Sequence, residues 1–453
     1  MQRALALEAS PPLSFALRFF LGAPFYVLLS GLLLLYAGPS ALASRWQPAI
    51  LALTHLLALG AIAQTMFGAL LQILPVATGI RSFHSAPLVG GIHLSLNLGI
   101  LSLASAFLTG QPLLFLTASI LLALAFGAFL LTLAWALWRD RARRTKGAPT
   151  ILLAVRLALI ALLLTVLLGL FLANHYSFSW PLPRWLTDMH AAWGLLGWVG
   201  LLVIGISFQV IPIFQVTERF PDGVTHWLAL VLFIFLLILS AALYWARSSP
   251  VMGWGPSSPK FWLSWLLLGF AFYAWVALQL LKNRKRPHPD TTTVFWRTAY
   301  FSLIAILLLW GGGQLLPLLP SAAALSSSIS LKLPLWLGGL ALLGFAWSAI
   351  NGMQYTILPF LLWFNAQRNA PVVIRELPRV RHYLPDAQAR PQWYVHGLSL
   401  LLFALALGGM PILIYPAAAV LCLSTLWFYK NIAYALRQYQ AALQLIASRV
   451  ESE

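Results

Sequence analysis

The chain has 453 residues, of which 61% are hydrophobic and only 8% are charged, and it contains 20 Trp. So little polar surface could not cover a water-soluble globule of this size, and the composition therefore excludes an ordinary soluble protein. A net charge of +18 would suit a nucleic-acid-binding protein, but the positions of the basic residues along the chain exclude that class.

Twelve apolar runs are long enough to cross a hydrocarbon layer of roughly 30 Å at about 1.5 Å per residue. In chain order they cover 15–36, 49–74, 88–108, 113–137, 151–173, 190–213, 226–246, 261–281, 294–316, 334–361, 394–410 and 412–432. The predicted fold is all-α, a polytopic membrane protein with twelve transmembrane helices. The one cysteine, Cys422, lies in the last run, so we expect neither disulfides nor a thiolate metal cluster.

The basic residues predict how the loops lie relative to the membrane. With the N-terminus in the cytoplasm, all but five of the 28 Lys and Arg fall on the cytoplasmic side, and the five are Arg45, Arg184, Arg247, Lys260 and Lys332. This bias predicts a multi-pass protein of the cell (inner) membrane with both termini in the cytoplasm. The predicted partner of the charge is the anionic headgroups of the lipid bilayer, with no nucleic acid. The longest interruption, 365–392, is expected to be a basic cytoplasmic loop.

A three-residue pattern recurs near the ends of the second, sixth and tenth runs. Each copy has a glycine, a polar residue four positions later and a proline three positions after that: Gly68, Gln72, Pro75; Gly205, Gln209, Pro212; Gly352, Thr356, Pro359. The spacing puts each triplet on one helix face. It predicts a single membrane domain of three repeats, about 1–145, 146–290 and 291–453, in three pseudo-symmetric four-helix arcs. The proline and glycine would kink the helix and free a backbone carbonyl, and the polar side chain would hydrogen-bond to the opened backbone, which favours a structural role for the triplet. A pore-lining or ligand role is the alternative.

Histidines recur at two depths of this frame. His55 and His190 open the second and sixth runs, about 30 Å from the triplet prolines, and His175 ends the fifth run near the same surface. These three are candidate metal ligands, because imidazole binds copper, iron and zinc. A weaker candidate set recurs near the inner ends of later runs: His93, His226 and His396. The alternative for His55 and His190 is an imidazole that caps a helix start at the membrane interface and keeps one nitrogen in water. For the inner three it is an imidazole that hydrogen-bonds to backbone carbonyls.

Three local strings on this frame are His55-Leu-Leu-Ala-Leu-Gly60, His93-Leu-Ser-Leu-Asn97-Leu-Gly99 and His190-Ala-Ala-Trp-Gly194. Together with the threefold plan they resemble the catalytic subunit of the haem-copper oxidase superfamily. The resemblance implies that His55 is an axial ligand of haem b and that His190 binds copper. The chain departs from the family because its tenth run has no histidine and because Trp227 follows His226 in place of a second histidine. We therefore expect no oxygen reduction at the standard dinuclear centre, and no catalytic residue is assigned.

Two functional classes remain open from the sequence. The first is a redox or gas-handling membrane protein that binds haem, copper or both through His55 and His190 and uses a partner subunit or a quinone. Met353 is a candidate replacement ligand, although it lies about 9 Å along the helix from Pro359 and hence on the inner side. The second is a cofactor-free transporter or respiratory assembly factor, whose charge-free cavities pass a small neutral or apolar molecule or hold a quinone.

Overall fold

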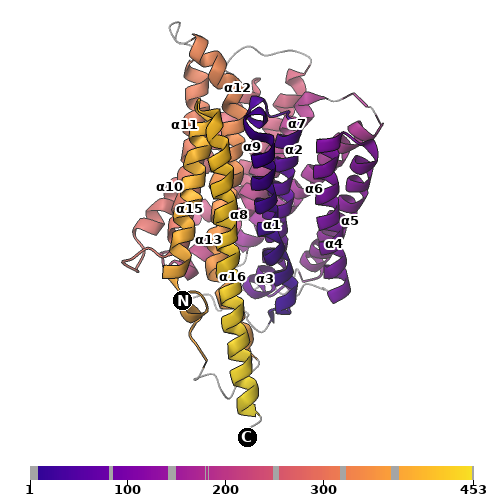
Figure 1. Ribbon diagram of the computed structural model, residues 1–453. Coiled ribbons are helices and arrows are strands. Elements are labelled where there is room, and N and C mark those ends of the chain that lie inside the picture. The colour runs from indigo at the N-terminus through magenta and orange to yellow at the C-terminus, as the bar shows by residue number, and fades with distance from the viewer. Residues whose placement is uncertain are drawn as a thin grey trace.

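A computed structural model gives the structure of the chain. It describes residues 9–80, 85–140, 149–178, 180–181, 183–247, 255–316, 323–368 and 377–450. In these ranges the chain is helical, without strands, and Figure 1 shows the long helices side by side along one direction. Eleven stretches of the described chain are long and apolar enough to cross a membrane. The prediction of an all-helical, multi-pass membrane protein is thus confirmed.

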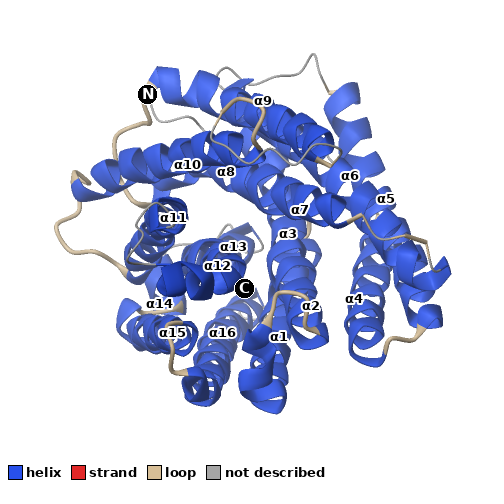
Figure 2. Cartoon of the chain, turned by 90° about the horizontal axis from the view of Figure 1, so that it is seen from above, coloured by secondary structure: helices blue, strands red, loops and turns tan. Residues whose placement is uncertain are grey.

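The helices follow one another with short connections. In chain order they are α1 (Leu13–Ala37), α2 (Pro48–His55), η3 (Leu56–Ala63), α3 (Gln64–Thr78), α4 (Ala86–Thr109), α5 (Pro112–Arg139), α6 (Pro149–Phe178), α7 (Arg184–Ala192), η4 (Trp193–Gly200), α8 (Leu201–Phe214), α9 (Asp222–Ala246), α10 (Pro259–Lys282), α11 (Thr291–Leu315), α12 (Ala323–Gly339), η7 (Leu340–Trp347), α13 (Ser348–Arg368), α14 (Val380–Tyr383), α15 (Asp386–Leu407) and α16 (Ile414–Val450). Short 3₁₀ turns, η2 (Gly38–Ala43) and η8 (Pro411–Leu413), follow α1 and precede α16. Seen along the helices, α1, α11, α15 and α16 lie around α12 and α13, and α4 and α5 lie at the periphery (Figure 2).

The eleventh predicted run, 394–410, is the one that is not among the eleven apolar spans. Its helix, α15, begins with a polar half that contains Arg390, Gln392 and His396. At its first turn Asp386 accepts a hydrogen bond from the backbone N–H of Thr291 at the start of α11, and at its last turn the Leu407 carbonyl accepts one from Lys332. The helix therefore runs the height of the bundle, although it is less apolar than its neighbours.

Several predicted boundaries differ from those observed. The sixth helix begins at Arg184 and not at 190, and α16 continues to Val450, well past the predicted end at 432. The predicted loop 365–392 is shorter, because α13 continues to Arg368 and α15 begins at Asp386. Part of that loop, 369–376, lies outside the described residues.

The second, sixth and tenth predicted runs share an unusual internal structure. Each begins as an α-helix, continues as an eight-residue π-helical segment and returns to an α-helix. The π-helical segments begin at Leu56, Trp193 and Leu340, in each case 12 residues before the glycine of the triplet. Extended π-helix is rare and concentrates at functional or strained positions. The recurrence of the glycine, polar residue and proline is therefore accompanied by a recurrence of backbone structure, because each π-helical segment begins at the same distance from its triplet.

Eight residues before each triplet glycine there is a second glycine, at positions 60, 197 and 344. A Cβ atom at Gly60, Gly197 or Gly344 would lie 2.2, 2.8 or 2.6 Å from a side chain of α1, α6 or α11. At the triplet glycines the nearest atoms of the same three helices would lie 3.0, 2.5 and 2.4 Å away. The contacted residues are seven apart in every case: Tyr26 and Phe19, Ala161 and Ala154, Ser302 and Phe295. Paired glycines thus let each π-containing helix approach one other helix closely, namely α1, α6 or α11.

The polar residue of the triplet contacts the beginning of that same partner helix in two repeats. Gln72 donates to the hydroxyl of Ser10, just before α1, at 2.8 Å. The hydroxyl of Thr356 in α13 lies 2.7 Å from the hydroxyl of Thr292 in α11. The Gln209 side-chain oxygen is buried without a hydrogen-bond partner among the described residues. Residues 141–148, which precede α6, lie outside the described part of the chain.

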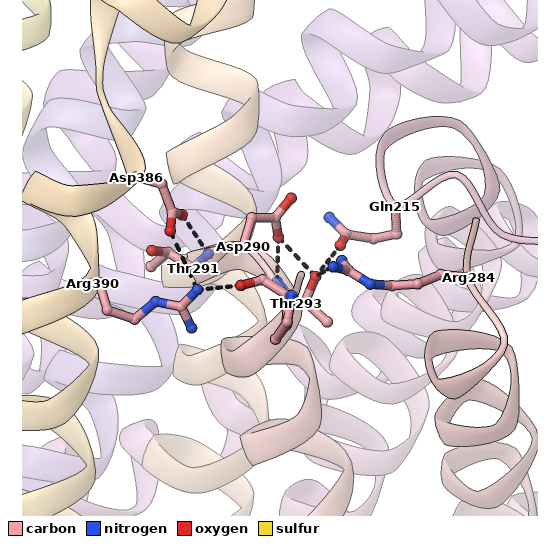
Figure 3. A network of polar contacts seen from close by, with 8 residues as sticks. Gln215, Arg284, Asp290, Thr291, Thr293, Asp386 and Arg390 are labelled. Carbon is pink, nitrogen blue, oxygen red and sulfur yellow. Dashed lines mark hydrogen bonds and ion pairs between the residues drawn. The ribbon is translucent and has the colours of Figure 1, made fainter. Parts of the chain in front are cut away.

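A polar network ties together α8, α11 and α15 at one end of the bundle, which we call the Arg284 end (Figure 3). The Thr293 hydroxyl accepts from Arg284 at 2.6 Å and lies 2.7 Å from an Asp290 carboxylate oxygen and 2.5 Å from the Gln215 side-chain oxygen. Burial lowers the pKa of Arg284, while Asp290 acts in the opposite direction. Arg390 completes the network by bonding to Asp386 at 3.2 Å. The opposite end, which carries Arg45, Asp188 and Lys260, is called the Arg45 end.

Candidate functional site

A cavity of about 1100 Å³ lies between the helices at the Arg45 end. Its walls come mainly from α2, α7, η4, α10, α11, α12 and η7, and most of the lining side chains are Leu, Ile, Phe and Ala. The lining residues on α10 run from Lys260 to Phe270, which is about 15 Å along the helix. Well-formed apolar pockets of roughly 300–1,000 Å³ are the usual binding sites for small molecules. The cavity is therefore the principal candidate site.

Charged groups line this cavity only at the Arg45 end. Arg45 bonds to Asp188 across 2.7 Å, with the two side chains 36% and 41% exposed, and its guanidinium lies 4.6 Å from the centre of the Trp46 ring. Such an exposed ion pair contributes only about 0–1 kcal/mol to stability. Lys260, the second residue of α10, also lines the cavity and is exposed. The cavity thus has an apolar interior with a charged rim.

His55 and His190 lie next to each other but outside this cavity. The centres of their rings are 6.3 Å apart and the ring planes differ by 19°. The Nδ1 atom of His55 lies 2.8 Å from the Leu51 carbonyl oxygen, and that of His190 lies 3.0 Å from the Thr165 carbonyl oxygen. A bond to a carbonyl requires the proton on Nδ1, which leaves Nε2 of a neutral imidazole as an acceptor or a metal ligand. The residues lining the cavity include neither histidine.

The histidine pair is closely packed on its outer sides. The Phe107 ring stacks on His55 with a centre-to-centre distance of 5.0 Å, and a Cβ at Gly169 would lie 2.9 Å from a carbon of the His190 ring. His175 contacts the Tyr176 ring at 5.1 Å, and its Nδ1 is buried without a hydrogen-bond partner among the described residues. No group of three or more His, Cys, Asp or Glu in the described ranges could hold a metal ion. His175 therefore does not complete a three-ligand site with the pair.

The inner histidines have three separate surroundings. His93 packs edge-on against Phe19 at 5.1 Å, and His396 bonds to the Ser348 hydroxyl at 2.8 Å and packs near Phe295. His226 is exposed, with its Nδ1 2.7 Å from the Asp222 carbonyl oxygen in its own turn. Because Phe19 and Phe295 also contact triplet glycines, His93 and His396 hold corresponding places in their repeats. Among the described residues they do not form a shared site with His226.

The described residues that line the cavity offer no axial ligand for a haem. The side chains that line the cavity include no His, Met, Cys or Tyr, which are the usual axial ligands of haem iron. Met353 is buried, and its sulfur accepts a hydrogen bond from the Trp296 indole at 3.2 Å. Phe107 and His190 stack on the faces of the His55 ring, and these contacts leave the ring nitrogens at its edge. The haem role of His55 stays a prediction.

Comparison with known proteins gives no family assignment for the chain. No protein-family model matches it, and no curated protein matches it in sequence. The function is therefore argued from the cavity and the side chains around it.

Proposed function

We propose that this protein binds and passes an apolar molecule through the cavity at the Arg45 end. The observation that carries the proposal is a large space inside the bundle whose walls are almost entirely hydrocarbon. Burying a methylene group gains about 0.8 kcal/mol, so a long alkyl chain or a quinone tail would be held by its length alone. Among the described residues that line the cavity, the charged ones are Arg45, Asp188 and Lys260 at the rim, and no acid or lysine marks an ion path through the apolar interior. This favours the cofactor-free class over redox chemistry.

The proposal includes twelve membrane crossings in three four-helix arcs, with α15 as the eleventh crossing. It is supported by the common register of the three π-helical segments and by the glycine pairs that contact α1, α6 and α11. It is further supported by the path of α15 from the Arg284 end to the Arg45 end. We place the Arg284 end in the cytoplasm of a cell (inner) membrane, with both termini, because most basic residues gather there.

Saturable binding of a long-chain alcohol tests the proposal. The full chain in detergent would be titrated with tritiated hexadecanol, and we expect about one bound molecule per chain. Gly339 lines the cavity, and a Cβ there would meet nothing within 4 Å, so Gly339→Phe should fill the space without a clash and abolish binding. Gly127→Phe, at an equally open position on α5, is the matched control. Equal binding by wild type and Gly339→Phe would refute the cavity as the site.

Copper binding is a second candidate function, favoured by the contact between His55 and His190. The Nε2 atoms of the two rings would supply two imidazole donors, and copper would supply redox or gas-binding chemistry there. Titration of the metal-free protein with copper(I) would show one tight equivalent that is lost in His55→Gln and in His190→Gln. Equal copper binding by wild type and both variants would rule the pair out.

A further inference from the structure

The rim of the cavity carries more positive than negative charge. Among the described residues Asp188 is the one acid at the Arg45 end, and it is already bonded to Arg45. Residues 248–254 and 317–322, which the structure does not describe, contain no Asp or Glu. Any further basic group at the cavity must therefore find an anion from outside the chain or remain paired with water.

Lys260 is that further group. It lines the cavity at the start of α10, and no described acid lies within ion-pair distance of its ammonium group. The other cations at this end either hydrogen-bond to groups of the chain or do not line the cavity. Arg247 bonds to the Tyr244 hydroxyl at 2.6 Å, Lys332 donates to the Leu407 carbonyl, and Arg184 does not line the cavity.

We propose that the cavity selects a single-chain anionic amphiphile, a long-chain carboxylate whose alkyl tail fills the apolar interior while its head pairs with Lys260. This inference rests on the proposed function and specifies its ligand class. Charge complementarity carries it, because Lys260 is a cation at the rim that no described acid pairs with, and a carboxylate head would supply the opposite charge. Hydrogen bonds between ionised groups are roughly twice as strong as neutral ones, so the charged head gives selectivity that the apolar walls cannot.

Two probes that differ only in the head group test the proposal on the full chain in detergent at pH 8. Tritiated hexadecanoate should bind about tenfold more tightly than hexadecanol to wild type, and the two probes should bind Lys260→Gln with equal affinity, because the variant loses more affinity for hexadecanoate than for hexadecanol. Arg184→Gln, an exposed cation off the cavity, is the matched control and should change neither affinity.

The possible failures are distinguishable. If neither probe binds wild type saturably, the proposed function fails. If both bind with equal affinity, the cavity takes apolar molecules and the selection of an anion is wrong. A parallel loss of both probes in Lys260→Gln would overturn the role of the charge, because the side chain would then only shape the cavity. An anionic phospholipid that displaces hexadecanoate tenfold better than the free acid would reassign the site to a lipid headgroup.

Discussion

The imidazole of His190 bonds through Nδ1 to the carbonyl oxygen of Thr165 on a different helix, at 3.0 Å. Thr165 also donates its hydroxyl to the Ala161 carbonyl one turn earlier in α6, while its own carbonyl accepts from the α7 side chain. The histidine therefore joins two helices whether or not it binds copper. Its contribution to the fold can be separated from any metal role.

His190→Ala should lower the stability of the protein. The change removes the His190 hydrogen bond to the Thr165 carbonyl, worth about 0.5–1.5 kcal/mol, and also the packing against Gly169. Thermal unfolding of metal-free protein in detergent, followed by tryptophan fluorescence, measures it. His226→Ala is the control, since His226 is exposed and bonds only within its own turn. Equal unfolding temperatures for the two variants would show that the contact to Thr165 does not contribute to the stability of the fold.

Replacing Gly60, Gly197 or Gly344 with alanine should lower the stability of the protein in each of the three cases. At Gly60, Gly197 and Gly344 the added Cβ would meet a side chain of the partner helix at 2.8 Å or less, and overpacking of this kind costs about 1–3 kcal/mol. Gly127→Ala and Gly311→Ala, whose Cβ atoms would meet nothing within 4 Å, should be neutral. The unfolding midpoint in a mixed-detergent titration reports the differences. An unaffected member of the three would argue against equivalent helix contacts in the repeats.

Thr293→Val should weaken the Arg284 end. The hydroxyl bonds to Arg284 and lies beside Asp290, and losing hydrogen bonds to charged groups costs about 2–3 kcal/mol. Thr117→Val, which removes a hydroxyl bonded only within α5, is the matched control. Limited proteolysis should cut the 284–290 loop faster in Thr293→Val than in wild type or control. Unchanged cutting would mean that other contacts hold this end.

Asp188→Asn should change ligand selectivity more than stability. The ion pair with Arg45 is about 40% exposed, so its loss costs no more than about 1 kcal/mol. The released Arg45 adds a second free cation to the rim and should raise hexadecanoate affinity about threefold, with hexadecanol unaffected. Equilibrium binding with both probes measures this. A fall in hexadecanoate affinity would show that the ion pair itself shapes the rim.

Part of this arrangement could be predicted from residue spacing. The triplets indicated that the second, sixth and tenth helices are alike, because a glycine, a polar residue and a proline recur at the same spacing in each. The glycines at 60, 197 and 344 recur at the same spacing too, eight residues before the triplet glycines, so they could have been predicted in the same way. The π-helical segments could not be predicted, since their backbone is set by packing against α1, α6 and α11.

The cavity was the main feature that spacing could not locate. Its walls are ordinary leucines and alanines, and nothing in an apolar run distinguishes a residue that faces lipid from one that faces an internal space. The depth of the histidines did place His55 and His190 at one level, but it could not show that Phe107 stacks on His55 or that the pair lies off the cavity. The eleventh run, 394–410, was predicted as a span from its apolar part, and the polar residues before it, such as Gln392, gave no sign that α15 begins at Asp386.

The most direct test of the central claim, that the cavity holds an apolar chain, is cryo-electron microscopy of the protein in nanodiscs with a long-chain ligand brominated along its tail. We expect bromine density inside the bundle between Leu196 and Leu342, which both line the cavity, and its disappearance in Gly339→Phe. Density confined to the lipid-facing surface of the helices, with the cavity empty, would contradict the account.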